Sequence, residues 1–238
     1  MLISVHVPKT GGASFRGILK DHYGERLRLD YADRPMAHGL LGRILSTAAG
    51  RWKIAGKDLA DCQCVHGHFL PVKYRFVRER TFAIWFRDPV ELVLSRYFFF
   101  KRYLKPDDLQ FKRYIKREDL SLDGYVRLAH FHNVYSKYLL GMRLEDFDFV
   151  GITENYGASL EVFRRMFGFP DVLREQKLNA NPDKPGCNYE ISEELRRRIL
   201  RYNKKDLEIY GRAVVLNRML QRRYLVGEHE GTPSPPDR

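Results

Sequence analysis

A glycine-containing loop near the start of the chain has the residue types of a phosphate-binding loop. The loop consists of Lys9-Thr10-Gly11-Gly12-Ala13-Ser14, between an apolar stretch and apolar residues at helical spacing. At such a junction, backbone N–H groups and the positive end of a helix dipole can surround a phosphate. The lysine precedes the glycines, so this is not a Walker A loop. Taken alone, the run is equally compatible with an ordinary turn.

A cation and a hydroxyl occur at a second predicted junction. Arg87 ends a β-rich run over residues 81–87, and Ser95 lies two turns into the helix that Asp88 and Pro89 begin. Together they could bind a second phosphate. The alternatives are an ion pair between Arg87 and Asp88 or a neighbouring carboxylate, and a surface or back-bonded serine at position 95.

Two histidines, His66 and His68, are separated by one glycine after a possible short strand over residues 62–66. Histidine takes up a proton near neutral pH, so it suits the role of a base toward a hydroxyl. Packing within a loop is the alternative for each. Neither Cys62 nor Cys64 has a recognised metal-site spacing with the pair, and we predict no metal.

Three strand-to-helix junctions must position these groups. Apolar or β-rich strands are predicted over residues 2–7, 81–87 and 148–153, each followed by helical periodicity. This alternation predicts an α/β fold of three layers, with a mostly parallel central sheet flanked by helices and ligands at the carboxyl ends of strands. Helices are also predicted over residues 36–48 and, capped by Ser192, from there to about residue 220.

Length and composition favour one globular domain. The chain has 238 residues, of which 44% are hydrophobic, so we predict a single domain over residues 1–226 and a disordered tail over residues 227–238. The net charge of +12 attracts anions without specifying which. The absence of an apolar run of about 18 residues, and of a secretion signal, predicts a soluble, cytoplasmic chain without a transmembrane segment. Its three cysteines are expected to be free thiols.

Together, the two phosphate motifs resemble those of the sulfotransferases that use 3′-phosphoadenosine 5′-phosphosulfate (PAPS). Residues 8–15 look like the 5′-phosphosulfate loop of that family, and the stretch from Arg87 through Ser95 to Tyr97 looks like its 3′-phosphate motif. The similarity is greatest to the heparan and dermatan uronyl 2-O-sulfotransferases and their bacterial relatives, and it runs to about residue 210. Position 13 departs from the pattern, because it holds alanine where many members carry Thr or Ser.

The resemblance implies a P-loop-like sulfotransferase fold and transfer of a sulfuryl group from PAPS to a hydroxyl, releasing 3′-phosphoadenosine 5′-phosphate (PAP). It implies that Lys9 contacts the sulfuryl group and the bridging oxygen, and that His68 is the base. The implied phosphate contacts are Thr10, Gly11, Gly12, Ala13 and Ser14 for the 5′-phosphate, and Arg87 and Ser95 for the 3′-phosphate. The implied acceptor is a carbohydrate or glycan, and the charge of the chain suits an anionic one. Family members also place cofactor contacts in the loop that holds Asn179, Asn181 and Lys184.

Two other functions fit parts of the sequence. One is a nucleotide or small-molecule kinase with an atypical phosphate loop, which lacks support because Gly-Lys-Ser/Thr and a clear Mg²⁺-binding carboxylate are missing. The other is a nucleic-acid-binding module, suggested by the basic and aromatic residues from Arg96 to Lys105. An amphipathic helix with a solvated basic face explains that stretch equally well, so no nucleic-acid partner is expected. The oligomeric state stays open.

Overall fold

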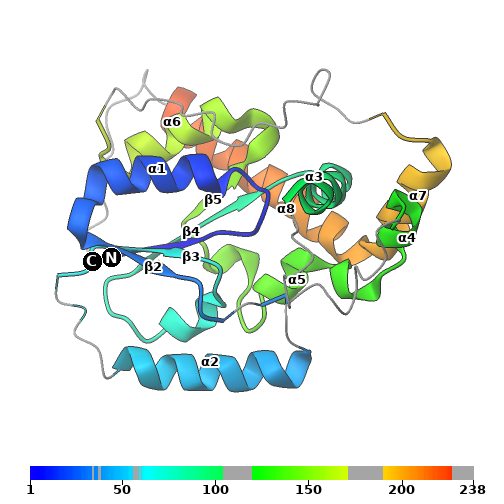
Figure 1. Ribbon diagram of the computed structural model, residues 1–238. Helices are drawn as coiled ribbons and strands as arrows, with labels where there is room; N and C mark the ends of the chain where they lie inside the picture. Colours follow the sequence, from blue (N-terminus) through cyan, green and yellow to red (C-terminus); the bar gives the residue numbers. More distant parts are fainter. Residues whose placement is uncertain are drawn as a thin grey trace.

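A parallel five-stranded sheet forms the centre of the protein (Figure 1). The computed structural model describes residues 1–33, 35, 36, 39–55, 59, 61–103, 120–170 and 190–226. The strand order is β2-β3-β1-β4-β5, and every neighbouring pair is parallel. The strands are β1 (Leu2–Val5), β2 (Leu27–Asp30), β3 (Cys64–Gly67), β4 (Thr81–Phe86) and β5 (Phe149–Ile152). The predicted parallel α/β architecture is therefore confirmed.

Helices cover both faces of the sheet (Figure 1). Alternate residues of a strand point to opposite faces, and Leu2 and Ile3 accordingly enter two separate hydrophobic clusters. One cluster is closed by α1 (Gly12–Tyr23) and α6 (Tyr156–Phe167), and the other by α5 (Val134–Tyr138) and α8 (Lys204–Gln221). The sheet is thus the middle of three layers, as its continuous apolar strands predict.

A third cluster lies beside the sheet, where α3, α4 and α7 pack through Val90, Tyr97, Tyr125 and Ile199. The remaining helices are α2 (Leu40–Ala55), α3 (Pro89–Tyr103), α4 (Leu122–Val126) and α7 (Glu193–Tyr202). Short 3-10 turns occur at Gly24–Arg26, Pro71–Tyr74, Ala129–Phe131, Leu144–Asp146 and Thr153–Asn155, and a π-helical turn at Arg222–Val226.

Both predicted helix caps are present. One carboxylate oxygen of Asp88 accepts hydrogen bonds from the backbone N–H groups of Val90 and Glu91, at 2.9 and 3.1 Å. The Ser192 hydroxyl accepts one from Leu195 at 3.2 Å. Each cap satisfies first-turn N–H groups that have no partner within the helix, which explains why α3 and α7 begin where they do.

The prediction of one long C-terminal helix was wrong, because the helix breaks at Asn203. Its side chain donates to the Ile199 carbonyl at 2.9 Å and accepts from the Asn133 backbone N–H at 2.9 Å. Asp206, which interrupts the apolar stripe, is buried and accepts from the backbone N–H of Tyr135 at 3.0 Å. Burial raises the pKa of Asp206 to about 6. These polar residues hold the start of α5, so they sit at a junction that periodicity does not reveal.

Several other expectations have mixed outcomes. Strand β2 was missed, because it is a half-exposed edge strand that alternates leucine with charged residues. Cys62 and Cys64 are free thiols as expected, whereas Cys187, the tail over residues 227–238 and the loop over residues 179–188 lie outside the described residues. In the described part of the chain, no helix is long and apolar enough to cross a membrane.

Candidate anion-binding and catalytic site

The candidate residues follow three adjacent strands. In the sheet register, Val5 of β1 is level with Gly67 of β3 and Ile84 of β4. The Lys9 loop, His68 and Arg87 therefore lie just beyond the carboxyl ends of these three strands. The chain leaves β1 toward β2 and leaves β4 toward β5, so the direction of winding changes between β1 and β4. Open α/β sheets bind ligands at the carboxyl ends of strands beside such a switch point.

The Lys9 loop has an unusual backbone conformation. Lys9 and Gly11 have φ angles of 75° and 83°, in the left-handed region. That region strains a residue other than glycine by about 1–3 kcal/mol, and such residues occur at ligand-binding sites. Helix α1 begins at Gly12 and has no acidic residue in its first turn, which includes Ala13 and Ser14. No carboxylate in that turn offsets the positive end of its dipole.

Gly11 and Gly12 are required for different reasons. At Gly11 the positive φ favours glycine, and an added Cβ would lie 3.2 Å from the Tyr156 ring. At Gly12 an added Cβ would lie 1.9 Å from the imidazole of His6, which is a clash. The loop therefore lies directly on the His6 ring, and the close approach that suits a phosphate cradle also serves packing.

Thr10 holds the loop to the sheet. Its buried hydroxyl donates to the Val7 carbonyl at 2.9 Å. Its carbonyl lies 3.1 Å from the hydroxyl of Thr153, which is also 2.8 Å from the Phe86 carbonyl. Because the hydroxyl proton of Thr10 is already used, this residue can serve a ligand mainly through its backbone.

The Lys9 ammonium lies among other cations. Its Nζ is 4.3 Å from the centre of the Phe99 ring on α3. Burial lowers the pKa of Lys9, and the nearby positive charges of Arg87 and Arg102 lower it further. Three cations gathered at one place repel one another and favour a multiply charged anion between them.

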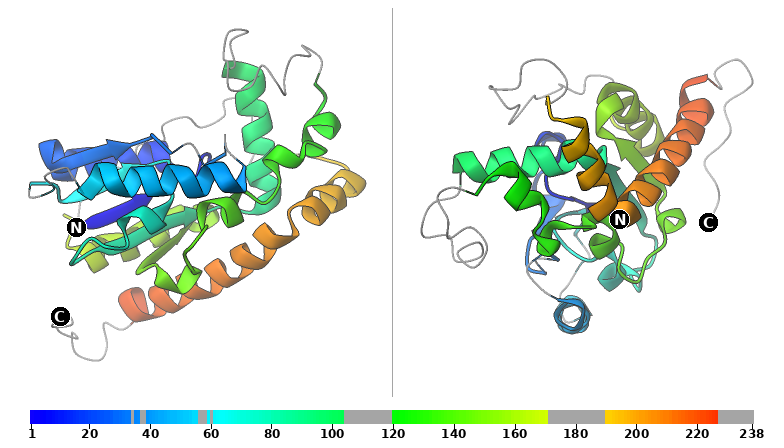
Figure 2. Two further views of the ribbon diagram at one scale, coloured as in Figure 1. Left: turned by 90° about the horizontal axis from the view of Figure 1, so that it is seen from below. Right: turned by 90° about the vertical axis from the view of Figure 1, so that its right-hand side faces the viewer.

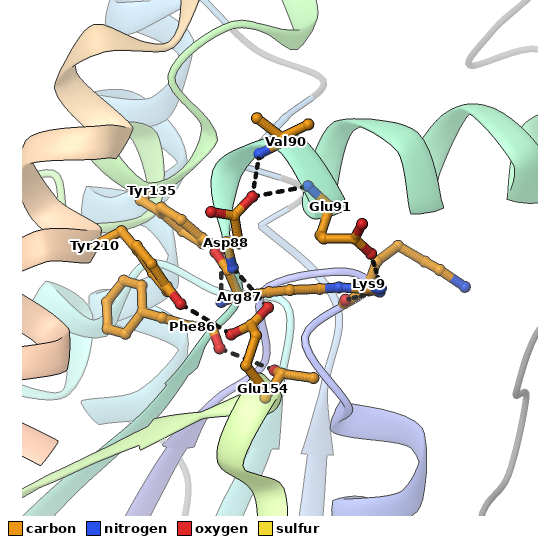
Figure 3. A network of polar contacts seen from close by, with 10 residues as sticks. Lys9, Phe86, Arg87, Asp88, Val90, Glu91, Tyr135, Glu154 and Tyr210 are labelled. Atoms are coloured by element: carbon orange, nitrogen blue, oxygen red, sulfur yellow. Dashed lines mark hydrogen bonds and ion pairs between the residues drawn. The ribbon is translucent and has the colours of Figure 1, made fainter. Parts of the chain in front are cut away.

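Arg87 joins the two candidate motifs (Figure 3). Its Nη1 donates to the Lys9 carbonyl at 3.4 Å, and its Nη2 donates to Glu91 at 3.0 Å. The ion pair that the sequence left open for Arg87 is therefore formed with the neighbouring carboxylate of Glu91 and not with Asp88. A guanidinium has five N–H groups, and these bonds use two of them. Ser95, buried and one further turn along, lies on the same side of α3.

A polar network fixes the start of α3 (Figure 3). Glu154 accepts from the Asp88 backbone N–H at 2.9 Å and from the Tyr210 hydroxyl at 3.1 Å. The Tyr135 hydroxyl accepts from the Arg87 N–H at 2.8 Å. The role of Glu91 could have been found from its i+4 spacing to Arg87, but the two tyrosines come from distant segments and gave no local signal.

His68 has the hydrogen bonding of a neutral base. Its Nδ1 lies 2.5 Å from the His6 carbonyl oxygen, which can only accept, so Nδ1 carries the proton. The other ring nitrogen, Nε2, then has its lone pair available. Burial lowers the pKa of His68, which keeps the ring neutral near pH 7.

His66 occupies a different environment. It is buried, and its Nδ1 lies 2.8 Å from the Ser4 hydroxyl. Burial lowers its pKa to about 3. His6, which the sequence did not single out, is half-buried and stacks on it with ring centres 5.2 Å apart. His66 is therefore packed beneath the loop, whereas His6 and His68 are both half-buried.

The basic and aromatic stretch after residue 95 divides between the core and the site. Arg96 and Tyr97 are buried, with the Arg96 guanidinium 5.1 Å from the centre of the Phe131 ring. Phe99 is the neighbour of Lys9. Lys105 lies outside the described residues, among which no group of three or more His, Cys, Asp or Glu could hold a metal ion.

No protein-family model matches the chain, and no curated protein matches it.

Proposed function

We propose that this protein is a PAPS-dependent sulfotransferase with a P-loop-like fold, acting on a hydroxyl of a carbohydrate or glycan. The observation that carries the proposal is the hydrogen bond between the Arg87 guanidinium and the Lys9 carbonyl, which joins two motifs 78 residues apart at the switch point of the sheet. PAPS carries two separate phosphate groups, so it requires two linked anion sites. The Lys9 loop and the start of α3 supply them.

The residues fit the charges of such a donor. The N–H groups at the start of α1 and the close approach allowed by Gly11 and Gly12 suit the 5′-phosphate. The N–H groups of Arg87 that are not bonded to Lys9 or Glu91, together with the hydroxyl of Ser95, suit the 3′-phosphate. PAPS would supply the sulfuryl group, and transfer of this kind depends on positioning and on stabilising the charge of the leaving oxygen. The Lys9 ammonium has that role.

His68 is the proposed base. Its Nε2 can take the proton of the acceptor hydroxyl while Nδ1–H stays bound to the His6 carbonyl. Because β3 and β4 flank β1 on opposite sides, His68 and Arg87 approach the Lys9 loop from opposite directions. The acceptor is therefore expected on the β3 side of the loop and the 3′-phosphate on the β4 side.

Ligand binding tests the proposal without knowledge of the acceptor. PAP that binds only the folded state should stabilise it by about 2.7 kcal/mol at a hundredfold excess over its Kd. Thermal shift and calorimetry would compare PAP with ATP plus Mg²⁺ and with oligonucleotides. Equal or greater stabilisation by ATP plus Mg²⁺ would favour a kinase, and preferential binding of oligonucleotides would favour a nucleic-acid-binding module. Labelled PAPS with a panel of glycans and simple alcohols would then identify the acceptor.

A further inference from the structure

Helix α2 exposes its apolar side chains. Five large apolar residues on it are between 50% and 84% exposed, and we call them the α2 face: Leu40, Leu41, Ile44, Leu45 and Trp52. Four of them, Leu40, Leu41, Ile44 and Leu45, lie on one face of the helix predicted over residues 36–48. In a surface helix such an apolar face ordinarily packs against the core. Contiguous exposed apolar patches on soluble proteins mark interaction sites.

The side of α2 that meets the protein is small and polar instead. Gly42, Arg43, Ser46, Thr47 and Gly50 are the half-buried positions. The helix packs on the 3-10 turn Pro71–Tyr74, where a Cβ on Gly50 would lie 3.2 Å from the side chain of Lys73. The orientation is therefore the reverse of that of an ordinary surface helix. Its apolar residues face outward, and its polar contacts attach it to the fold.

Positive charge lies beside the α2 face. Arg51 is an exposed cation on the helix, whose sequence has no acidic residue. The Arg51 guanidinium lies 5.5 Å from the centre of the Phe76 ring, which is itself 40% exposed. The segment around Phe76 has three further exposed arginines, at positions 75, 78 and 80, and one exposed glutamate at position 79. The chain as a whole has a net charge of +12.

We propose that the α2 face binds the surface of an anionic lipid bilayer, with α2 lying in the plane of the interface. Leucine, isoleucine and tryptophan would enter the boundary between headgroups and acyl chains, and the arginines would meet anionic headgroups. Charge favours this partner over a second copy of the chain, because two such faces would bring like charges together.

The position of α2 is compatible with this partner. The helix lies at the lower margin of the molecule in Figure 1 and in the right view of Figure 2, on the side of the sheet opposite α1, and it is in front in the left view of Figure 2, which is seen from below. The Lys9 loop lies beyond the carboxyl ends of the strands rather than beneath α2. A bilayer on the α2 face would leave the candidate anion-binding site open, and the inference does not depend on the proposed function.

Tryptophan fluorescence provides a direct test on the unmodified protein. The chain has two tryptophans: Trp52 is 84% exposed, whereas Trp85 is 2% exposed in the core. Adding phosphatidylserine-containing vesicles should shift the emission to shorter wavelength, and lipids brominated near the headgroup should quench it. Phosphatidylcholine vesicles should have a smaller effect, and added salt should weaken binding. Trp52→Phe should abolish the shift, because the remaining tryptophan is already buried.

Vesicle co-sedimentation with paired variants separates this face from general stickiness. Leu41→Ser combined with Leu45→Ser should reduce partitioning at least about tenfold. The matched control, Val215→Ser with Met219→Ser, changes exposed apolar residues on α8 and should bind like the wild type. Absence of binding to anionic vesicles, or equal loss in the control, would overturn the proposal. A dimer in light scattering that the Leu41/Leu45 variant dissociates, without vesicle binding, would assign the face to a second copy.

Discussion

Replacing Arg87 with alanine should weaken PAP binding, and the structure adds a complication to the expected size. Loss of a charge-assisted hydrogen bond to a phosphate costs roughly 1.5–3 kcal/mol, or roughly 10- to 150-fold in Kd. The Arg87 and Glu91 side chains are only 16% and 12% exposed. Arg87→Ala therefore also removes the guanidinium that pairs with the mostly buried Glu91 carboxylate. This loss should lower the free energy of unfolding by about 1–3 kcal/mol.

Glu91→Gln separates the two effects. The glutamine amide oxygen can still accept from the Arg87 guanidinium, while one negative charge is removed beside the proposed phosphate. A unit charge a few ångströms away in a water-like dielectric is worth about 1 kcal/mol, so PAP should bind roughly fivefold more tightly. In the double variant Arg87→Ala/Glu91→Gln, the stability lost by Arg87→Ala should largely return, whereas its PAP affinity should stay low.

Calorimetric titration with PAP and chemical denaturation of all four proteins provide the assay. A folded Arg87→Ala protein with unchanged PAP affinity would remove Arg87 from the binding site. If Glu91→Gln weakened PAP binding as much as Arg87→Ala, the ion pair would be needed to shape the site rather than to compete with the phosphate, and the electrostatic reasoning would be refuted.

Three further results are expected at the Lys9 loop and the histidines. Lys9→Ala should reduce turnover more than PAPS affinity, because a cation at the leaving oxygen acts most strongly in the transition state; loss of affinity alone would demote Lys9 to a binding residue. His68→Ala should bind PAP normally and lose about 10²- to 10⁴-fold in turnover. The wild-type pH profile should have an acidic limb below the ordinary histidine range, because the pKa of His68 is lowered, and the variant should lack that limb. An inactive His66→Ala beside a fully active His68→Ala would contradict this assignment. The pKa of His66 is about 3 in the folded state and 6.5 ordinarily, so the unfolded state binds the proton first as the pH falls. Between pH 6.5 and pH 3, the free energy of unfolding should therefore decline by about 1.4 kcal/mol per pH unit because of His66. Denaturant titrations should give a shallower decline for His66→Gln, and an unchanged slope would show that His66 is not held neutral.

Local sequence was sufficient for the elements that carry the site. The strands before Lys9 and Arg87 are continuous apolar runs, and the helices after them start at a glycine loop and at an Asp-Pro cap. These signals lie within a few residues of one another, so periodicity and capping chemistry predict them. The resemblance of residues 8–15 and 87–97 to sulfotransferase motifs was also visible in the sequence, and the reaction class expected from it stays a prediction.

Tertiary structure decided what each candidate residue touches. The pairing of β1 with both β3 and β4 brings Lys9, His68 and Arg87 to one edge, and strand order is not encoded by any local pattern. The two histidines around Gly67 have similar local sequence, yet one is buried against Ser4 and the other is half-buried, with its ring bonded to the His6 carbonyl. The apolar stripe of α2 predicted a helix, but only the packed structure shows that the stripe faces solvent. The physical reason is the same in each case: propensity acts between neighbours in sequence, whereas burial and partner choice depend on residues that are distant in the chain.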